Sequence, residues 1–318
     1  IETLFDISEK DSYKQPIITI GAICNGKQHA WILHPEKEQI IKLAATEGAF
    51  HGENTFVHNF HDELSMLTHF FQFVIDEDAD IIQGHNVECF DHPYIIKRYE
   101  MLSGEYPCWG RIKVLRTTLC EAYCSTTLKI PIHGRVTVDS CSILRREVKS
   151  NSYKLDDLGE EFLHESKIHL PYTDIQKHYQ TKQGRAFLAV YCVKDAWLSM
   201  KLLERFGIVD LYVNLANLTS LDLSPICKGG QGIRTYSLLY RKCKGKYFLP
   251  KTGKKDGKTY EGATMISKAG KNQMKQVTGW KKNQLNAKQK AIKLICNASY
   301  GFFAGYYIYN ERLAGAVT

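Results

Sequence analysis

Residues 80–91 read DIIQGHNVECFD. The apolar residues after Asp80 are typical of a strand, which ends in a turn containing Gly84. Asp91 then stands where a helix is expected to begin. Asp caps free backbone amides in a first helical turn, and Pro93 is also favoured there. Asp91 is therefore either a helix cap or a functional carboxylate at a strand's end. An isolated Asp-x-Pro favours the cap, so the choice depends on the rest of the chain.

Strands and helices are expected to alternate on both sides of this stretch. Two strand-like segments are separated by Asn25-Gly26, a dipeptide typical of hairpin turns. Apolar residues recur at helical or strand spacing in the other segments. The expected strands are 17–23, 29–33, 80–83 and 134–139, and the expected helices are 63–75, 91–101 and 153–163. This alternation predicts a layered α/β or α+β domain.

A second notable carboxylate, Asp195, lies within the longest expected helix, residues 184–206. Tyr191 precedes it by one turn and shares its face, because residues four apart stack along a helix. A carboxylate facing a core is costly unless it is paired, hydrogen-bonded or bound to a metal. The alternative is an Asp turned to solvent between Lys194 and Lys201, and the pattern alone leaves both open.

The composition is that of an ordinary globular protein. The chain has 318 residues, of which 44% are apolar and 24% charged. No segment approaches the roughly 18 apolar residues that a membrane span needs, so no membrane partner is expected. The ten cysteines are scattered rather than paired at regular spacings, which predicts a reduced, intracellular protein.

Positive charge is concentrated in the C-terminal part of the chain. Between Arg241 and Lys293 lie 16 of the 42 lysines and arginines but only two acidic residues, which leaves a formal charge of −6 elsewhere. A solvated surface is the simplest explanation, although the aromatic residues within this block favour a polyanion as partner. The glycine-rich segment 227–232 predicts a boundary between domains 1–226 and 227–318.

The last expected helix, residues 285–301, carries three polar residues at related positions. Lys293, Asn297 and Tyr300 are spaced to share one face, and Gly301 follows where a helix would stop. This face is either plain surface or a site where the lysine contacts a triphosphate and the tyrosine packs against a base or sugar.

Five motifs occur in the order found in family B DNA polymerases. Residues 1–3 (IET) resemble the end of the first exonuclease motif, while 86–91 (NVECFD) and 191–195 (YCVKD) match the second and third. Residues 260–263 (YEGA) resemble the element between the exonuclease and polymerase parts, and 293–301 resemble polymerase motif B. The resemblance implies an RNase H-like exonuclease domain, a mixed sheet flanked by helices. A partial, mainly helical palm and fingers segment would follow it.

The resemblance also implies a role for each matching residue. Glu2 and Asp195 would hold a water-activating metal, Asp91 a second metal, and Tyr191 would orient the attacking water. Mg²⁺ is the expected ion, with Mn²⁺ as a possible substitute. The partners would be the 3′ end of single-stranded DNA and a primer–template, with a deoxynucleoside triphosphate in the complete enzyme. The residues expected to contact DNA are Asn86, Phe90, Tyr260 and Gly262, and those expected to contact the nucleotide are Lys293, Asn297, Tyr300 and Gly301.

Two departures from the family pattern limit these expectations. The first carboxylate of the family would stand before Ile1, and the palm aspartates of motifs A and C find no match. A fragment, a rearranged gene product or a skipped exon would each explain this. The chain would then be an incomplete polymerase, with a free-standing exonuclease or a non-catalytic nucleic-acid-binding remnant as alternatives. A processivity factor cannot be read from the sequence, nor can the choice between the nucleus and a viral replication site.

Overall fold

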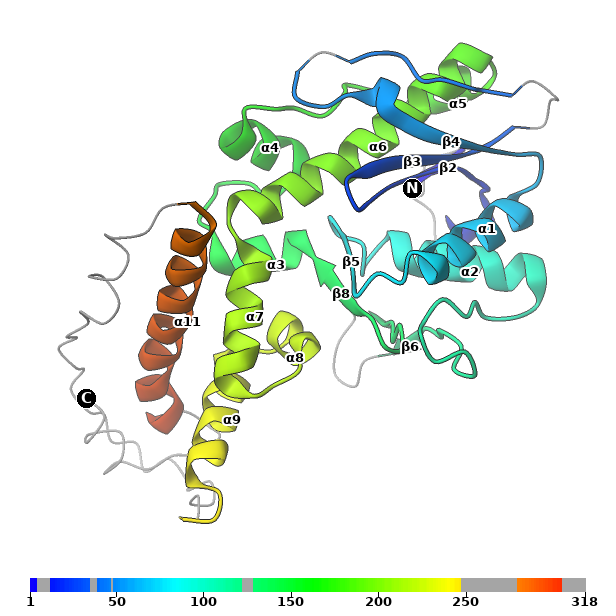
Figure 1. The fold of residues 1–318 in the computed structure, drawn as a ribbon. Helices are drawn as coiled ribbons and strands as arrows, with labels where there is room; N and C mark the ends of the chain where they lie inside the picture. Colours follow the sequence, from blue (N-terminus) through cyan, green and yellow to red (C-terminus); the bar gives the residue numbers. More distant parts are fainter. Residues whose placement is uncertain (5–11, 35–38, 47, 122–127, 247–278, 305–318) are drawn as a thin grey trace. The chain divides into compact units, whose positions relative to one another are not determined.

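The computed structural model contains two compact units, the first unit Ile1–Arg205 and the second unit Phe206–Thr318 (Figure 1). It describes all residues except 5–11, 35–38, 47, 122–127, 247–278 and 305–318. The motif at 260–263, with Tyr260 and Gly262, therefore lies outside the described residues.

The first unit is built around a four-stranded sheet in the order β1-β2-β3-β4. Strands β1 and β3 run antiparallel to β2, whereas β4 runs parallel to β3. A parallel pair, β5 and β8, and a short antiparallel pair, β6 and β7, complete the strands. Their bounds are β1 Glu2–Thr3, β2 Ile17–Cys24, β3 Lys27–Leu33, β4 Thr55–Phe60, β5 Ile81–Gly84, β6 Cys120–Glu121, β7 Leu128–Lys129 and β8 Val136–Asp139. The predicted hairpin is confirmed, since Asn25 and Gly26 both have the positive φ of a two-residue turn.

Helices cover both faces of this sheet. Figure 1 shows α1 and α2 on one side of the four-stranded sheet and α6 on the other. The helices are α1 Glu63–Asp76, α2 Asp91–Ser103, α3 Ser140–Glu147, α4 Leu155–Leu163, α5 Ile175–Tyr179 and α6 Lys182–Arg205, with 3-10 turns at Ser12–Lys14, Gly52–Asn54 and Tyr172–Asp174. The predicted alternation of strands and helices is confirmed, and the unit is a mixed α/β structure.

The main core lies between the sheet and the pair α1 and α2. Trp31 of β3 is fully buried there against Phe70 of α1, and Tyr94 and Ile96 of α2 extend the same cluster. A buried ion pair between Glu63 and Arg98 joins the two helices, and Glu63 Oε1 also accepts a hydrogen bond of 2.8 Å from the backbone N–H of Ile17. The start of β2 is thereby fixed against the helices that flank it.

A glycine allows α6 to lie directly on β2. A Cβ atom at Gly21 would lie 2.7 Å from the backbone of Cys192, which is closer than real Cβ contacts come. Only glycine allows this approach. The contact brings residues 191–195 of α6 beside the strand that pairs with Glu2 of β1.

The second unit is helical in its described part, as predicted. Its helices are α7 Ile208–Thr219, α8 Leu223–Lys228, α9 Gln231–Cys243 and α11 Gly279–Ala304. Arg234 of α9 is buried, lies over the Tyr212 ring of α7 and donates a hydrogen bond of 2.7 Å to the carbonyl of Ile226 in α8. On α11, Ala291 and Ile295 are buried.

The division between the units falls earlier than the expected boundary at residue 226. Helices α7 and α8 pack against α9 and therefore belong to the second unit. The chain leaves α6 at Gly207, which has a φ of +59°. The expected connector 227–232 is instead the end of α8, Gly229-Gly230 and the start of α9. None of the helices in the described residues is long and apolar enough to span a membrane.

Candidate active site

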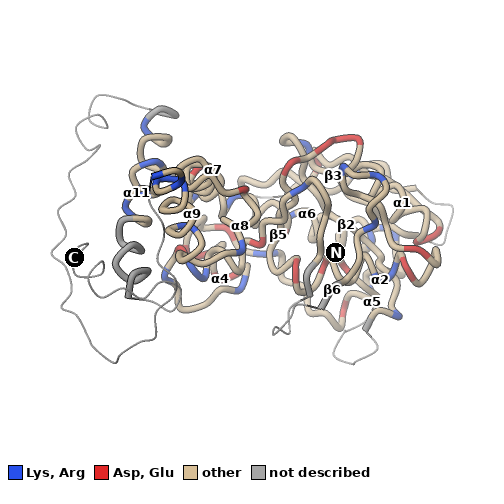
Figure 2. The backbone as a smooth tube through the Cα atoms, turned by 90° about the horizontal axis from the view of Figure 1, so that it is seen from below, with Lys and Arg blue, Asp and Glu red and all other residues tan. Residues whose placement is uncertain are grey.

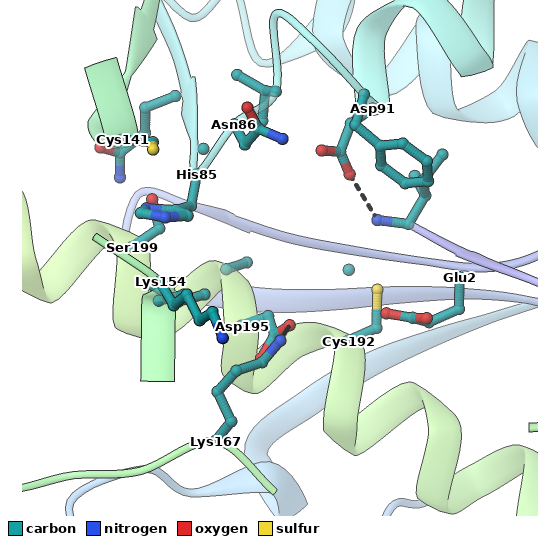
Figure 3. Close-up of a pocket in the computed structure, with 18 of the residues that line it drawn as sticks. Glu2, His85, Asn86, Asp91, Cys141, Lys154, Lys167, Cys192, Asp195 and Ser199 are labelled. Atoms are coloured by element: carbon teal, nitrogen blue, oxygen red, sulfur yellow. Dashed lines mark hydrogen bonds and ion pairs between the residues drawn. The ribbon is translucent and has the colours of Figure 1, made fainter. Parts of the chain in front are cut away.

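A pocket of about 560 Å³ in the first unit brings together six of the predicted site residues (Figure 3). They come from β1, from the turn between β5 and α2, and from α6. The six are Glu2, Asn86, Phe90, Asp91, Tyr191 and Asp195. Figure 3 shows Asp91 on one side of the pocket, with Asp195 and Lys167 on the other. The three predicted carboxylates therefore surround one cavity, although they are far apart in the sequence.

Asp91 does not cap the helix that it begins, so the capping interpretation is wrong. The N-cap of α2 is Phe90, and no side chain makes a capping hydrogen bond there. Asp91 Oδ1 instead accepts a hydrogen bond of 2.9 Å from the α-ammonium group of Ile1. The Asp91 carboxylate therefore lies in the pocket rather than against the helix amides.

Asp195 is paired with a lysine that the sequence did not single out. Lys167 Nζ lies 2.6 Å from Asp195 Oδ2 and 5.2 Å from the centre of the Tyr191 ring. Asp195 Oδ1 is buried and accepts no hydrogen bond from the described residues. Burial raises the pKa of Asp195, while the charge of Lys167 opposes this shift. One oxygen of Asp195 therefore remains available to a ligand in the pocket.

The pKa of Glu2 lies well above the usual range of a glutamate. Burial raises its pKa to about 7, although the ammonium group of Ile1 favours the ionised form. Asp195 and Asp91 contribute to this rise, because each is a like charge in the same pocket. A cation bound among the three carboxylates would relieve this repulsion.

Tyr191 keeps its hydroxyl proton at neutral pH. Burial raises the pKa of the phenol, and the negative charges of Asp195 and Glu2 act in the same direction. Lys167 Nζ also lies over this ring, 5.2 Å from its centre. Tyr191 is therefore a hydrogen-bond donor at the edge of the pocket.

His85 connects several segments that line the pocket through hydrogen bonds. Its Nε2 lies 3.0 Å from the carbonyl oxygen of Tyr153, which only accepts, so Nε2 carries the proton. Its Nδ1 lies 2.9 Å from Ser140 Oγ, which in turn lies 3.1 Å from Ser199 Oγ. Burial lowers the pKa of His85, which favours this neutral form. This series of hydrogen bonds links the turn after β5 to α3, to α6 and to the segment before α4.

The donor set suits a hard divalent cation, although the carboxylates now face ammonium groups. Three carboxylates line the pocket, and the unbonded Oδ1 of Asp195 is the kind of buried acceptor that a cation satisfies. Within the described residues, no three Asp, Glu, His or Cys side chains converge closely enough to hold one ion as they stand. The reason is local, because Asp91 turns to the Ile1 ammonium and Asp195 to Lys167.

The side chains predicted to contact the nucleotide, and two of the four residues predicted to contact DNA, lie largely outside the described part of the chain. Lys293 is exposed on α11. Asn297, Tyr300 and Gly301 lie on the same helix, but their side chains are not among the described ones, and Tyr260 and Gly262 lie outside the described residues altogether. Figure 2 shows lysines and arginines on α9 and along the described part of α11. These assignments stay predictions.

Sequence reasoning missed the cationic side of the pocket. Lys167 reaches it from the segment after α4, while Lys154 and Arg145 line it from the segment before α4 and from α3. The backbone N–H of Lys167 donates a hydrogen bond of 2.7 Å to Asp156 Oδ1, which fixes the segment. Irregular segments have no periodicity that would reveal the direction of a side chain. The one available signal was a lysine between Ser166 and Ile168 in an otherwise acidic region.

Comparison with known proteins agrees with this geometry. Residues 1–158 match the sequence profile described as "DNA polymerase family B, exonuclease domain". Residues 1–158 form a family B exonuclease domain. This match, together with the mixed α/β structure of the first unit, confirms the predicted RNase H-like fold.

Similar full-length proteins are catalytic subunits of DNA polymerase delta. The chain is 33% identical to that of Candida albicans over 228 residues, which are 68% of this chain and 22% of the relative. It is 33% identical to that of Caenorhabditis elegans over 219 residues, 64% of this chain and 20% of the relative. Identity to that of Dictyostelium discoideum is 30% over 299 residues, 84% of this chain and 27% of the relative. The chain thus spans between 20% and 27% of the length of these three relatives.

Proposed function

We propose that the pocket removes nucleotides from the 3′ end of single-stranded DNA, as the proofreading site of a family B DNA polymerase. The observation that carries this proposal is the gathering of Glu2, Asp91 and Asp195 around one cavity, with a buried acceptor left unbonded on Asp195. The family match of residues 1–158 and the polymerase relatives support the same activity.

Glu2, Asp91 and Asp195 would hold two divalent ions, Mg²⁺ or in its place Mn²⁺. Ions bound there supply an activated water and stabilise the charge that develops on the leaving oxygen. To bind them, Glu2 and Asp195 must both be ionised, and burial opposes this in the free pocket. Cation binding should therefore release protons near neutral pH.

The remaining side chains orient the DNA. The Tyr191 hydroxyl retains its proton and can donate a hydrogen bond to the attacking water or to the phosphate. Lys167 holds its positive charge beside Asp195, where a phosphate would be attracted. Asn86 is exposed at the turn and Phe90 offers an aromatic face for the terminal base, an interaction that tolerates any sequence. Lys154 is exposed at the rim and suits the DNA backbone.

For the second unit we propose a part of the palm and fingers of the polymerase. Lys293, Asn297, Tyr300 and Gly301 would contact a deoxynucleoside triphosphate in the complete enzyme, and Tyr260 and Gly262 would contact primer–template DNA. The helical structure and exposed lysines of this unit support the proposal. The site of action would be where DNA is replicated, in a nucleus or a viral replication site.

The test of the exonuclease proposal is degradation of 5′-labelled single-stranded DNA by the full chain with Mg²⁺. The Asp91→Ala variant should lose activity by a factor of about 10² or more, since a charge-stabilising group is removed. Asp76→Ala is the control, because Asp76 is an exposed carboxylate at the end of α1 that is bonded to Gln72. Equal activity in the wild type and Asp91→Ala would contradict the site assignment.

A second version of this test adds one Asp before Ile1. The new peptide bond removes the ammonium charge that lies 2.9 Å from Asp91 Oδ1, and the new side chain adds a fourth carboxylate at the pocket. Cleavage should become faster and should need less Mg²⁺. An added Asn is the matched control, because it removes the ammonium charge without adding a carboxylate. If the wild type and the chains extended by Asp and by Asn are all inactive, the result favours the interpretation of the chain as a non-catalytic nucleic-acid-binding remnant.

A further inference from the structure

Asp139 accepts hydrogen bonds from the backbone N–H groups of two different segments beside the pocket. It ends β8 and is 5% exposed. Its Oδ1 accepts hydrogen bonds from the backbone N–H groups of Cys141 at 2.9 Å and Ser142 at 3.2 Å, at the start of α3. It also accepts from the N–H of Asn86 at 3.1 Å, and its Oδ2 accepts from the N–H of Glu88 at 3.2 Å.

The second pair of bonds is made to the turn that carries Asp91. Strands β5 and β8 are parallel and in register, with Gly84 opposite Asp139, so both chains leave the sheet at the same edge. The turn after Gly84 is not an ordinary one, since Asn86 has a φ of +64° in the left-handed region. Such a conformation costs free energy and persists where neighbouring groups hold it. The N–H of Asn86 itself and the N–H of Glu88, two residues later, both donate hydrogen bonds to Asp139.

We propose that Asp139 is a positioning residue, whose carboxylate holds the 86–91 turn so that Asp91 and Asn86 face the pocket. This inference rests on the proposed exonuclease function. Asp139 does not line the pocket and acts through the turn. Its two oxygens accept four N–H groups, a demand that a carboxylate meets because it only accepts. An asparagine would place an amide donor against at least one of these N–H groups.

Helix capping alone does not account for this arrangement. Asp139 is the N-cap of α3, which explains the bonds to Cys141 and Ser142. The bonds to Asn86 and Glu88 satisfy no helix amide and connect segments more than 50 residues apart in the sequence. Asp62 offers the matched comparison, since it caps α1 by accepting from Ser65 N–H at 2.8 Å.

The decisive variant is Asp139→Ser, because serine is a good N-cap but its single hydroxyl is too short to hold both segments. Asp62→Ser is its control. In the full chain with Mg²⁺ and single-stranded DNA, kcat of Asp139→Ser should fall about 100-fold, the order expected for a misplaced reacting group, with a much smaller rise in KM for DNA through Asn86. Asp139→Glu, which keeps the carboxylate, should restore part of kcat. Asp62→Ser should keep kcat and most of its thermal stability, because serine preserves the cap.

A measurement without metal or DNA tests the same inference on the turn itself. Hydrogen exchange at the amides of Asn86 and Glu88 should become faster in Asp139→Ser, while the amides of α3 stay protected. Unchanged exchange at these two amides would overturn the inference, and so would faster exchange with normal kcat. An equal loss of kcat in Asp62→Ser would reduce the role of Asp139 to stability. If the wild type is inactive, the proposed function fails, but the exchange result still reports on the turn.

Discussion

The two units of this chain place charge in opposite ways. In the first unit, Glu2, Asp91 and Asp195 come from distant segments and are partly buried around one pocket, where ammonium groups offset the charge of Asp91 and Asp195. In the described part of the second unit, the lysines of α11 are exposed along a helix whose buried face is apolar. Buried charges depend on position to within fractions of an ångström, whereas exposed charges act mainly through their number.

This difference separates cleavage from attraction of DNA. On the proposed function, a change at the carboxylates or at Lys167 should act mainly on the rate of the chemical step. A change on α11 should alter affinity and its salt dependence. Variants of matched chemistry in the two units can therefore test whether the separation is real.

The largest expected effect in this comparison is that of Lys167→Met. The variant keeps much of the apolar stem but removes the ammonium 2.6 Å from Asp195 Oδ2, so a partly buried carboxylate loses its partner. With 5′-labelled DNA, kcat should fall about 100-fold, in line with the removal of a preorganised charge at a reacting centre. The pKa of Asp195 should also rise further, which shifts the lower limb of the pH–rate profile upward.

Lys201→Met is a close control for this variant. Lys201 lies 2.8 Å from Glu204 and 6.0 Å from the centre of the Trp197 ring, so it too has a carboxylate and an aromatic neighbour. Its pair lies away from the pocket residues, and such exposed pairs contribute little. If Lys167→Met lowered only DNA affinity, Lys167 would act like a surface lysine and the contrast between the units would fail.

Asp91, Tyr191 and Asp195 were singled out because they lie in motifs that resemble those of a family, since the local pattern alone left other interpretations of the two aspartates open. Strand and helix patterns give the direction of a side chain, so the end of β5 and one face of α6 could be located in advance. The fold followed for the same reason. The hairpin at Asn25-Gly26, the α1 helix and the long α6 helix all have strong local signals.

The rest of the site depends on contacts that no local pattern contains. Lys167 enters the pocket from an irregular segment held by Asp156, and Asp139 acts through backbone amides of a turn 51 to 53 residues away. The expected cap at Asp91 was wrong because its carboxylate lines the pocket and no side chain makes a capping hydrogen bond at the start of α2. The two compact units divide after Arg205, whereas the glycine-rich segment 227–232 predicts a domain boundary at residue 226, which stays a prediction.

Glu2→Gln is expected to have an effect of intermediate size. The measurement is the melting temperature as a function of pH, with EDTA present to remove divalent ions. The pKa of Glu2 is about 7 in the folded chain, above its ordinary value of 4.5. Below pH 4.5 the carboxyl is protonated in both states and ionisation has no effect on stability. As pH rises towards 7 and beyond, the unfolded state loses its proton first, so the wild type becomes less stable.

Glu2→Gln should therefore melt at a higher temperature than the wild type at pH 8 and at a similar temperature at pH 4. The melting temperature should rise by about 2–4 °C for each kcal/mol that the substitution adds to the free energy of unfolding. Glu204→Gln, at an exposed residue of α6, should show no such rise. Mg²⁺ should abolish the advantage of Glu2→Gln at pH 8, since a bound cation stabilises the ionised carboxylate. An advantage that persists in Mg²⁺ would show that Glu2 holds no ion.

The smallest effect is expected on α11, for Lys288→Gln combined with Lys290→Gln. Both lysines are exposed. If both contact phosphates, the slope of log affinity against log salt should become less steep by about 0.7 for each lysine on single-stranded DNA. Fluorescence anisotropy over a salt series measures this slope. Lys177→Gln in α5 is the control, because that lysine is exposed and paired with Asp174 at 2.7 Å. An unchanged slope in the double variant would make these lysines a solubilising surface, and attraction of DNA would then have to come from the pocket and its rim.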